Sequence, residues 1–230
     1  MSLKQDILRF LRTEASKGQV EELVDAVNLA YERAFEQSKG LRNLPTHRKL
    51  AQDRNFFVQD VLIGQSSWQG SCVSASHNGE QFALLRTGST LITASVVPWR
   101  KKIRPSKGRL KNSRLNAYLE HLQRNPDLFE GQDLLGKLAT DSLNLIIAPL
   151  SPATKSTLDQ SKPQGLMIAV PYANNLDKFH LWCTAQELLL SYEDGDEADD
   201  DDDEPGGSVW PKLRIRMRSE EEKTDSENDQ

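Results

Sequence analysis

Eight basic residues stand within fifteen consecutive positions in the middle of the chain, directly after Trp99. They are Arg100, Lys101, Lys102, Arg104, Lys107, Arg109, Lys111 and Arg114. Flexible cations that follow an anionic backbone, with an aromatic ring available to stack on a base, suit sequence-tolerant binding of nucleic acid. The stretch therefore predicts a DNA- or RNA-binding segment. A solvated loop, or one that pairs with acidic residues of this same chain, is the alternative that its composition allows equally well.

The charge of the chain is strongly segregated, which its net value of −5 conceals. Residues 193–204 contain ten acidic side chains and no basic one, and residues 219–230 contain six acidic side chains against Lys223. These two segments together carry −15, so the rest of the chain carries +10. A basic body joined to acidic segments indicates something about binding partners and does not name a reaction.

The acidic run at residues 193–204 has three roles open to it. A block of like charge is most often a disordered, solvating spacer. It can also fold back and compete with phosphate for the basic stretch, since tethering gives it a high effective concentration. Finally, it can dock on a basic partner protein and steer that association electrostatically.

An alternating pattern follows the acidic run at residues 209–218. Its arginines are Arg214, Arg216 and Arg218, and its apolar residues are Leu213, Ile215 and Met217. Because alternate residues of a strand point to opposite faces, this pattern predicts a possible C-terminal strand with one cationic face. Arg214 and Arg216 would then extend the nucleic-acid-binding surface. The other interpretation is an edge strand whose charges protect it from aggregation.

Residues that could perform catalysis form no convincing constellation. The four histidines, at positions 47, 77, 121 and 180, lie in different predicted elements and show no metal-binding spacing. The glycine-rich loops that hold nucleotide phosphates are absent. A metal-dependent nuclease built on Glu80, Asp141 and Arg86 stays the third hypothesis, although nothing in their spacing demands it. We therefore predict no catalytic residue, no metal site and no cofactor.

The aromatic and cysteine residues are interpreted mainly as parts of the core. Cys72 and Cys183 lie in strand-like apolar runs without a CxxC spacing, which favours two reduced, buried thiols. Trp68, Trp99, Trp182 and Trp210 are candidates for exposed anchors of an interface, but the apolar run around Trp182 favours a core position for it.

The N-terminal part, residues 1–63, is predicted to be a helical subdomain. A capping box at Ser2 opens a short first helix, and apolar residues recur at three- and four-residue spacing from Val20 to Phe35. Gly40 is placed to end that second helix, and Pro45 and Thr46 to open a third.

The next part, residues 64–192, is predicted to be an α+β core domain. Strands are expected at 71–76, 81–86, 91–97, 143–150, 165–172 and 179–183, with Asn78-Gly79 as a hairpin turn. Pro98, Pro105 and Gly108 predict that the basic stretch is an exposed loop, followed by a helix capped at Asn112 or Ser113. A further helix is expected after Pro126, and residues 185–190 could continue the last strand or form a short helix.

Together these patterns predict an α+β fold, with N-terminal helices packed on an antiparallel or mixed sheet. Residues 193–208 are expected to be a flexible acidic loop, residues 209–218 the possible strand, and residues 219–230 a disordered acidic tail. No membrane span or signal peptide is apparent, so a cytoplasmic location is expected. The preferred function is a non-enzymatic nucleic-acid-binding protein modulated by its acidic segment. The alternative is a regulatory or adaptor subunit, antitoxin-like or inhibitor-like, that binds a protein partner through the acidic run or the N-terminal helices.

Overall fold

The computed structural model describes residues 3–40, 46–65, 67–74, 81–98, 102–124, 142–153 and 156–196, which belong to a unit spanning Met1–Ala198. Several predictions fall outside these residues. They concern Trp99, Arg100, Lys101, Arg214, Arg216 and Arg218, the Asn78-Gly79 turn, the helix after Pro126, most of the acidic run and the tail. They stay predictions, as do the domain boundaries.

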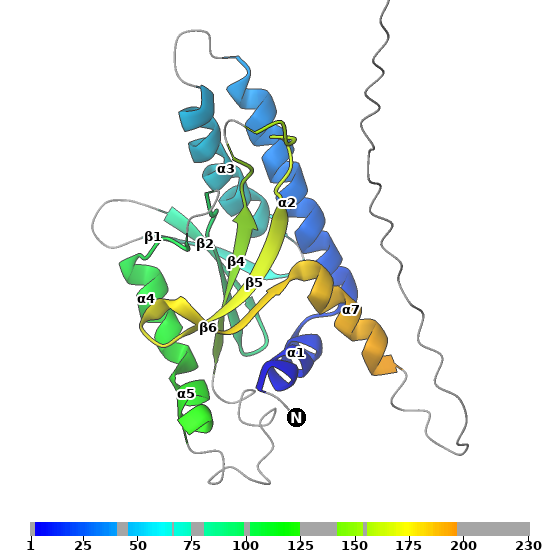
Figure 1. Ribbon diagram of the computed structural model, residues 1–230, viewed down its shortest axis with the longest axis vertical. Coiled ribbons are helices and arrows are strands. Elements are labelled where there is room, and N and C mark those ends of the chain that lie inside the picture. The colour runs from blue at the N-terminus through cyan, green and yellow to red at the C-terminus, as the bar shows by residue number, and fades with distance from the viewer. Residues whose placement is uncertain are drawn as a thin grey trace, which may run out of the picture. The chain divides into compact units, whose positions relative to one another are not determined.

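A six-stranded mixed sheet forms the centre of the fold, with the strands in sequence order across it (Figure 1). The strands are β1 (Gln69–Ser74), β2 (Gln81–Thr87), β3 (Thr90–Ala94), β4 (Leu143–Leu150), β5 (Gly165–Tyr172) and β6 (Asn175–Thr184). All neighbours are antiparallel except β3 and β4, which are parallel. The α+β class with a mixed sheet is therefore confirmed. The parallel pair requires a long crossover, and this crossover contains the basic stretch.

One face of the sheet is covered by helices α1 (Leu3–Glu14), α2 (Lys17–Ser38), α3 (Thr46–Ile63) and α7 (Ala185–Asp196). Helix α2 begins with the capping box of Ser16 and Gln19, and its apolar residues, including Val27 and Tyr31, are fully buried. The main hydrophobic core joins these helices to alternate residues of the strands, such as Ile147 and Ile168. The predicted packing of N-terminal helices on the sheet is thus confirmed.

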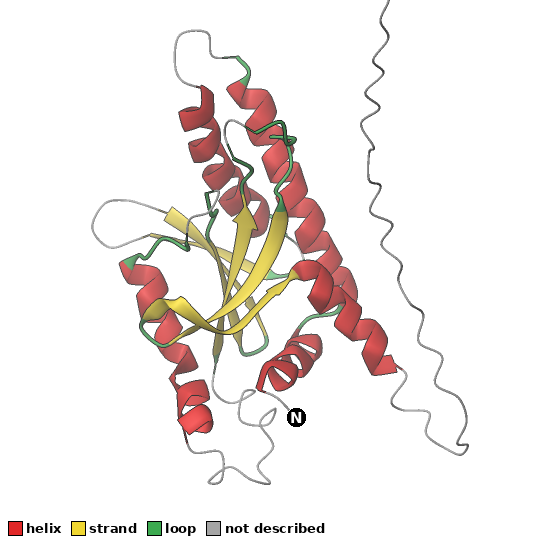
Figure 2. Cartoon of the chain, viewed as in Figure 1, coloured by secondary structure: helices red, strands yellow, loops and turns green. Residues whose placement is uncertain are grey.

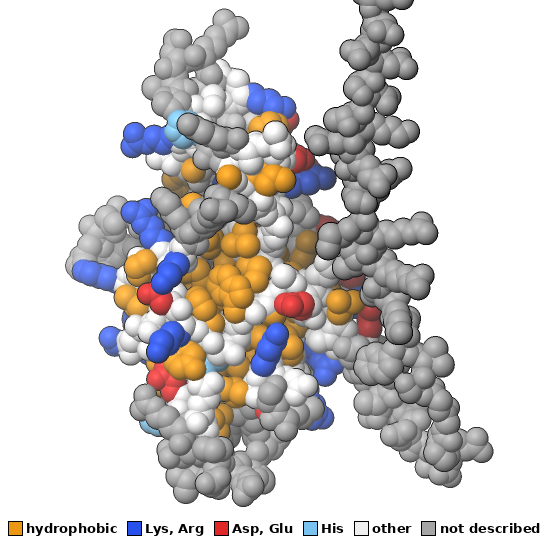
Figure 3. All heavy atoms as spheres, in the orientation of Figure 1, with side chains coloured by type: hydrophobic (Ala, Val, Ile, Leu, Met, Phe, Trp, Pro, Cys, Tyr) orange, Lys and Arg blue, Asp and Glu red, His pale blue; other side chains and the backbone are white. Residues whose placement is uncertain are grey.

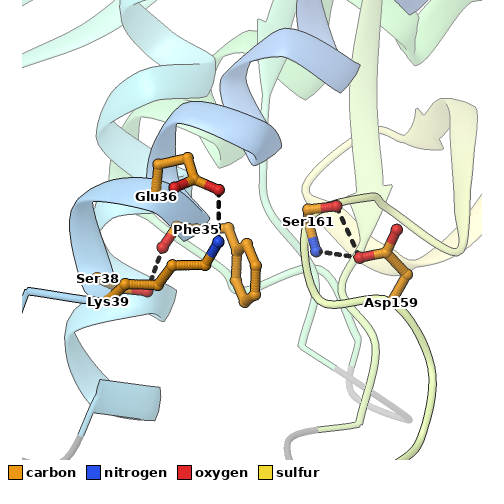
Figure 4. A network of polar contacts seen from close by, with 6 residues as sticks. All are labelled: Phe35, Glu36, Ser38, Lys39, Asp159 and Ser161. Atoms are coloured by element: carbon orange, nitrogen blue, oxygen red, sulfur yellow. Dashed lines mark hydrogen bonds and ion pairs between the residues drawn. The ribbon is translucent and has the colours of Figure 1, made fainter.

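The end of α2 lies two residues before the glycine expected to stop it. The helix ends at Ser38, whose hydroxyl donates to the carbonyl of Phe35 at 2.8 Å. Lys39 follows in a helical conformation, pairs with Glu36 at 2.6 Å and lies over the Phe35 ring (Figure 4). The backbone N–H of Lys39 donates to the carbonyls of Phe35 and Glu36, both at 3.3 Å, so the last turn of the helix is closed without Gly40 as the cap.

The opposite face of the sheet carries helix α4 (Lys107–Ser113), and a single 3-10 turn (Arg114–Asn116) joins it to helix α5 (Ala117–Arg124), whose Leu119 is buried in the main core (Figure 2). A second, smaller core lies here and includes Val97, Ile103, Ile146, Met167 and Leu176. Residues of β4 alternate between the two cores, because successive side chains of a strand point to opposite faces. Burial on both faces explains why β4 and β5 read as continuous apolar runs.

The prediction that the whole basic stretch is a loop is wrong, because its second half is helix α4. Ser106 caps this helix by accepting from the backbone N–H of Arg109 at 3.3 Å. The cap expected at Asn112 or Ser113 for the following helix is also wrong, because both residues lie inside α4 and the Ser113 hydroxyl donates to the carbonyl of Leu110 at 2.9 Å. Pro105 precedes the cap, where it does not interrupt helical hydrogen bonds. Gly108 lies in the first turn, and burial of Leu110 against the second core offsets its low helix propensity.

A tight turn at residues 87–89 joins β2 to β3. Gly88 has a φ of 48°, and the Glu14 carboxylate accepts from the backbone N–H of Ser89 at 2.7 Å. This contact ties α1 to the sheet. After β6, helix α7 runs from Ala185 to Asp196, so helical structure extends into the first residues of the acidic run.

Candidate nucleic-acid interface

Helix α4 presents a row of cations on its outward face. Lys107, Lys111 and Arg114 follow one another at spacings of four and three residues, which places them on one side of a helix, and all three are exposed. On the inward side of the helix, Leu110 packs against the second core and Ser113 is fully buried. Arg104, also exposed, lies three residues before Lys107. Helix α4 and the 3-10 turn that continues it at Arg114 thus align three of the positive charges, and Arg104 lies just before the N-cap of the helix.

The exposed face of the molecule shows how these charges lie relative to the sheet. Lys and Arg side chains gather on the α4 side of an apolar area that covers the middle of the sheet (Figure 3). No carboxylate among the described residues pairs with the side chains of Arg104, Lys107, Lys111 or Arg114. The row is therefore not neutralised by this part of the chain, and it attracts anions.

Two other basic residues of the stretch have partners within the fold. Arg109 is half-buried and donates to the carbonyl of Arg104 at 2.9 Å and to that of Ala94 at 3.2 Å. Its guanidinium therefore anchors the start of α4 to the end of β3.

Lys102 forms an exposed ion pair with Asp177 at 2.9 Å, which contributes little stability and leaves the lysine accessible.

A depression of about 300 Å³ separates the start of α4 from the β5–β6 turn. Ile103, Pro105 and Leu110 line one side of it, and residues 174–177 line the other. Arg114 reaches across the same junction, where its Nε donates to the side-chain oxygen of Asn174 at 2.8 Å. Asn174 has a φ of 57°, the left-handed conformation that asparagine tolerates in tight turns.

Buried asparagines hold the cationic helix on the sheet. Asn116, just after α4, donates to the carbonyls of Asn144 on β4 at 3.0 Å and Pro171 on β5 at 2.7 Å. Its side-chain oxygen accepts from the backbone N–H of Asn144 at 2.8 Å. Asn144 itself donates to the carbonyl of Leu91 on β3 at 3.3 Å. One buried network thus connects the helix to three adjacent strands.

An aromatic pair lies on the same face of the sheet, on the edge strand β6. The rings of Phe179 and Trp182 are 4.7 Å apart and tilted by 48°. A β-bulge brings them together: Leu181 pairs with Val170 and Phe179 pairs with Pro171, which leaves His180 as the extra residue. Trp182 is 40% exposed, so the prediction that it is a core residue is wrong. Its surrounding residues in the sequence contain no signal for the bulge.

The remaining tryptophans and cysteines divide differently from expectation. Trp68 is buried in the main core, whereas Trp99 and Trp210 lie outside the described residues. Cys183 is buried as predicted, and burial raises the pKa of its thiol to about 11. Cys72 is exposed, so the prediction of a second buried thiol is wrong. The reason is its position on β1, an edge strand with little covering it.

The extra residue of the bulge, His180, is buried and stacks on Tyr172, with ring centroids 3.9 Å apart and planes 8° from parallel. Neither of its ring nitrogens has a hydrogen-bond partner among the described residues. Burial lowers the pKa of His180 to about 4, and the nearby Glu120 opposes this effect. The imidazole is therefore neutral at physiological pH and occupies a structural position.

The described residues contain no group of three or more His, Cys, Asp or Glu side chains that could hold a metal ion. Glu80 and Asp141, two of the three residues considered for a nuclease, lie outside that part of the chain, and Arg86 is exposed on β2. Asp159 has a lowered pKa, caused by hydrogen bonds from the hydroxyl and N–H of Ser161 (Figure 4). This contact belongs to a loop turn and gives no sign of catalysis.

Comparisons with protein-family models, with curated proteins and with solved structures found no match to this chain. Within the described ranges, none of the helices has the length and apolar character needed to cross a bilayer. The function must therefore be argued from the geometry. Of the predicted binding residues, the structure aligns Lys107, Lys111 and Arg114 along α4 and the turn that continues it. It leaves Arg104 exposed before the helix, pairs Lys102 with Asp177 and gives Arg109 an anchoring role.

Proposed function

We propose that this chain is a non-enzymatic, cytoplasmic protein that binds nucleic acid through the outward face of α4. The observation that carries the proposal is the row of Lys107, Lys111 and Arg114, exposed at helical spacing and without a carboxylate partner among the described residues. Arg104 adds an exposed cation just before the helix, and Lys102 lies at the β5–β6 turn, where it pairs with Asp177. Phosphates spaced along a nucleic-acid backbone are the ligand that such a row of cations suits, because each contact releases condensed counterions.

Salt dependence tests this proposal directly. We expect a fluorescein-labelled oligonucleotide to bind the protein with an affinity that falls steeply with salt, measured by fluorescence anisotropy. A variant with Lys107→Gln, Lys111→Gln and Arg114→Gln should lose about two to three units of slope in log K against log salt. Three phosphate contacts correspond to about a 20- to 40-fold change in affinity between 50 and 200 mM salt.

A charge-matched control separates a local surface from general electrostatic attraction. The variant Arg9→Gln, Arg33→Gln and Lys162→Gln removes the same charge from exposed positions on α1, α2 and the loop before β5. It should retain most of the wild-type slope. Equal losses in both variants, or no binding of DNA or RNA at all, would contradict the proposal.

The acidic segment is the second part of the proposed function. The run at residues 193–204 carries ten acidic side chains on the same chain as the cationic row. We propose that it competes with phosphate for those cations and so sets the affinity. Replacing Asp199, Asp200, Asp201, Asp202 and Asp203 by Asn should raise the affinity several-fold at about 50 mM salt, with a smaller gain at high salt because screening weakens the competition.

The matched control for this substitution lies in the second acidic segment. Glu220→Gln, Glu221→Gln and Glu222→Gln remove negative charge farther along the chain. They should change the affinity less than the aspartate substitutions, per charge removed. An unchanged affinity after the aspartate substitutions would show that the acidic run is a spacer.

A regulatory or adaptor role is the second candidate function. Leu190 is 50% exposed on α7, the helix that leads into the acidic run. An apolar side chain next to a dense negative charge suits contact with a basic partner protein. A pull-down with the full chain should then recover one stoichiometric protein, and Leu190→Asp should lose it.

A further inference from the structure

Trp182 is the exposed member of the aromatic pair on β6, because Phe179 is half-buried against the second core. Trp182 is 40% exposed, although a tryptophan can bury a large apolar area. Trp182 lies on the face of the sheet that carries α4, because its partner in the register is Ala169, which belongs to the second core. Phe179 packs against that core and supports the Trp182 ring from one side. The Trp182 ring is therefore held in place by Phe179 and remains partly accessible.

This pair borders the same apolar cluster as the cationic helix. Leu110 of α4 and Phe179 of β6 both pack against the second core. Lys102 pairs with Asp177, only two residues before Phe179. Figure 3 shows the apolar area on this face with Lys and Arg side chains along its α4 side. Positive charge and exposed aromatic surface thus adjoin on one face.

The ligand that matches both features carries regularly spaced negative charges and accessible π-faces. Single-stranded nucleic acid has both, because its bases are not hidden by pairing and each base can stack on an aromatic side chain. A duplex has the phosphates but hides the faces of its bases. A protein partner would meet the apolar area, but it would need a matching acidic patch to satisfy the cations.

We infer that Phe179 and Trp182 form a stacking platform for unpaired bases, so that the surface prefers single-stranded DNA or RNA over duplex. The inference rests on the proposed function, which supplies the phosphate contacts of α4. The bulge at His180 is what makes the platform, because without it Phe179 would point to the opposite face from Trp182. The cations position the strand and the rings hold its bases.

Three probes of equal length test this inference with the full chain. They are a labelled single strand of about 12 nucleotides, the same strand with abasic sites, and its duplex, each titrated by fluorescence anisotropy. We expect the wild type to bind the intact single strand about 10-fold or more tightly than the abasic strand, since stacking contributes strongly to each bound base. Phosphate contacts alone would make these two affinities equal.

Substitution of the ring gives the decisive comparison. Trp182→Leu keeps an apolar residue at the site and should lower affinity for the intact strand about 10-fold, while its affinity for the abasic strand and its salt slope stay unchanged. Trp182→Phe should recover part of the loss. Phe56→Leu is the matched control, because Phe56 is 70% exposed on α3, in the layer on the opposite face of the sheet. It should bind like the wild type.

The outcomes separate this inference from the function on which it rests. If none of the three probes binds, the proposed function itself fails. If all three bind equally and Trp182→Leu changes nothing, phosphate binding stands and the stacking platform is overturned. Sedimentation of the free protein gives one more arm: a dimer that Trp182→Leu dissociates would assign this face to a second copy of the chain and would also overturn it.

Discussion

Acidification from pH 6.5 to about 4 is expected to remove about 3 kcal/mol of the free energy of unfolding through His180 alone. The imidazole is buried, stacked on Tyr172 and without a hydrogen-bond partner for either nitrogen among the described residues. A proton added in the folded state would create a charge that this environment does not solvate. The folded protein therefore resists protonation that the unfolded chain accepts.

The sign of the effect follows from the two pKa values of His180. In the unfolded chain the imidazole has its ordinary pKa of 6.5, and burial lowers the folded value to about 4. Between these values the unfolded state binds more protons than the folded state, so stability rises with pH. The contribution of His180 is fully present above pH 6.5 and is lost as the pH falls through about 4. Glu120 opposes the shift but does not cancel it.

Urea denaturation at a series of pH values checks this expectation. The wild type is compared with His180→Phe, which keeps an aromatic ring to stack on Tyr172 and cannot be protonated. The difference in unfolding free energy between the two proteins should change by about 3 kcal/mol between pH 7 and pH 4. Carboxylates that also titrate in this range affect both proteins equally. Parallel stability curves would falsify the assignment.

Loss of the Asn116 side chain is expected to destabilise the protein by about 3–5 kcal/mol. In Asn116→Ala, the backbone N–H and C=O of Asn144 and the carbonyl of Pro171 lose their side-chain partner at a buried position. A buried polar group without a partner costs about 1–3 kcal/mol, and three such groups share one site here. The same side chain attaches the cationic helix to the sheet, so nucleic-acid affinity should fall as well.

Chemical denaturation and the anisotropy titration together check this second prediction. Asn112→Ala is the control, because Asn112 lies on α4 and is only half-buried. It should cost less than about 1 kcal/mol, the usual range for a substitution away from a buried network. A similar loss of stability in both variants would show that Asn116 does not hold the helix in the way its hydrogen bonds indicate.

The candidate site shows which parts of a surface can be predicted without a structure. Lys107, Lys111 and Arg114 were identified from their density of charge, and their spacing is visible in the sequence. Their alignment on a helix is not predicted, because Pro105 and Gly108 favour a loop. The N-cap at Ser106 and the burial of Leu110 favour the helix more strongly than Pro105 and Gly108 disfavour it. The burial of Leu110 depends on contact with strands that lie far along the chain.

Tertiary contacts also decided which cations remain available. Arg109 resembles its neighbours in the sequence, yet its guanidinium bonds the carbonyl of Ala94 at the end of β3. Cys72 and Cys183 lie in similar apolar runs, but only Cys183 is in a covered strand. In each case the outcome depends on contacts with residues that are distant in the sequence, which local patterns do not reveal.

The sequence by itself determined the charge segregation, the helices α2 and α3, the strands and the α+β class, because these depend on periodicity and turn residues within a few positions. Only the tertiary structure decided the parallel pairing of β3 with β4, the bulge at His180 and the exposure of Trp182. These features depend on how one strand is registered against another. Register is set by long-range packing and cannot be read from neighbouring residues.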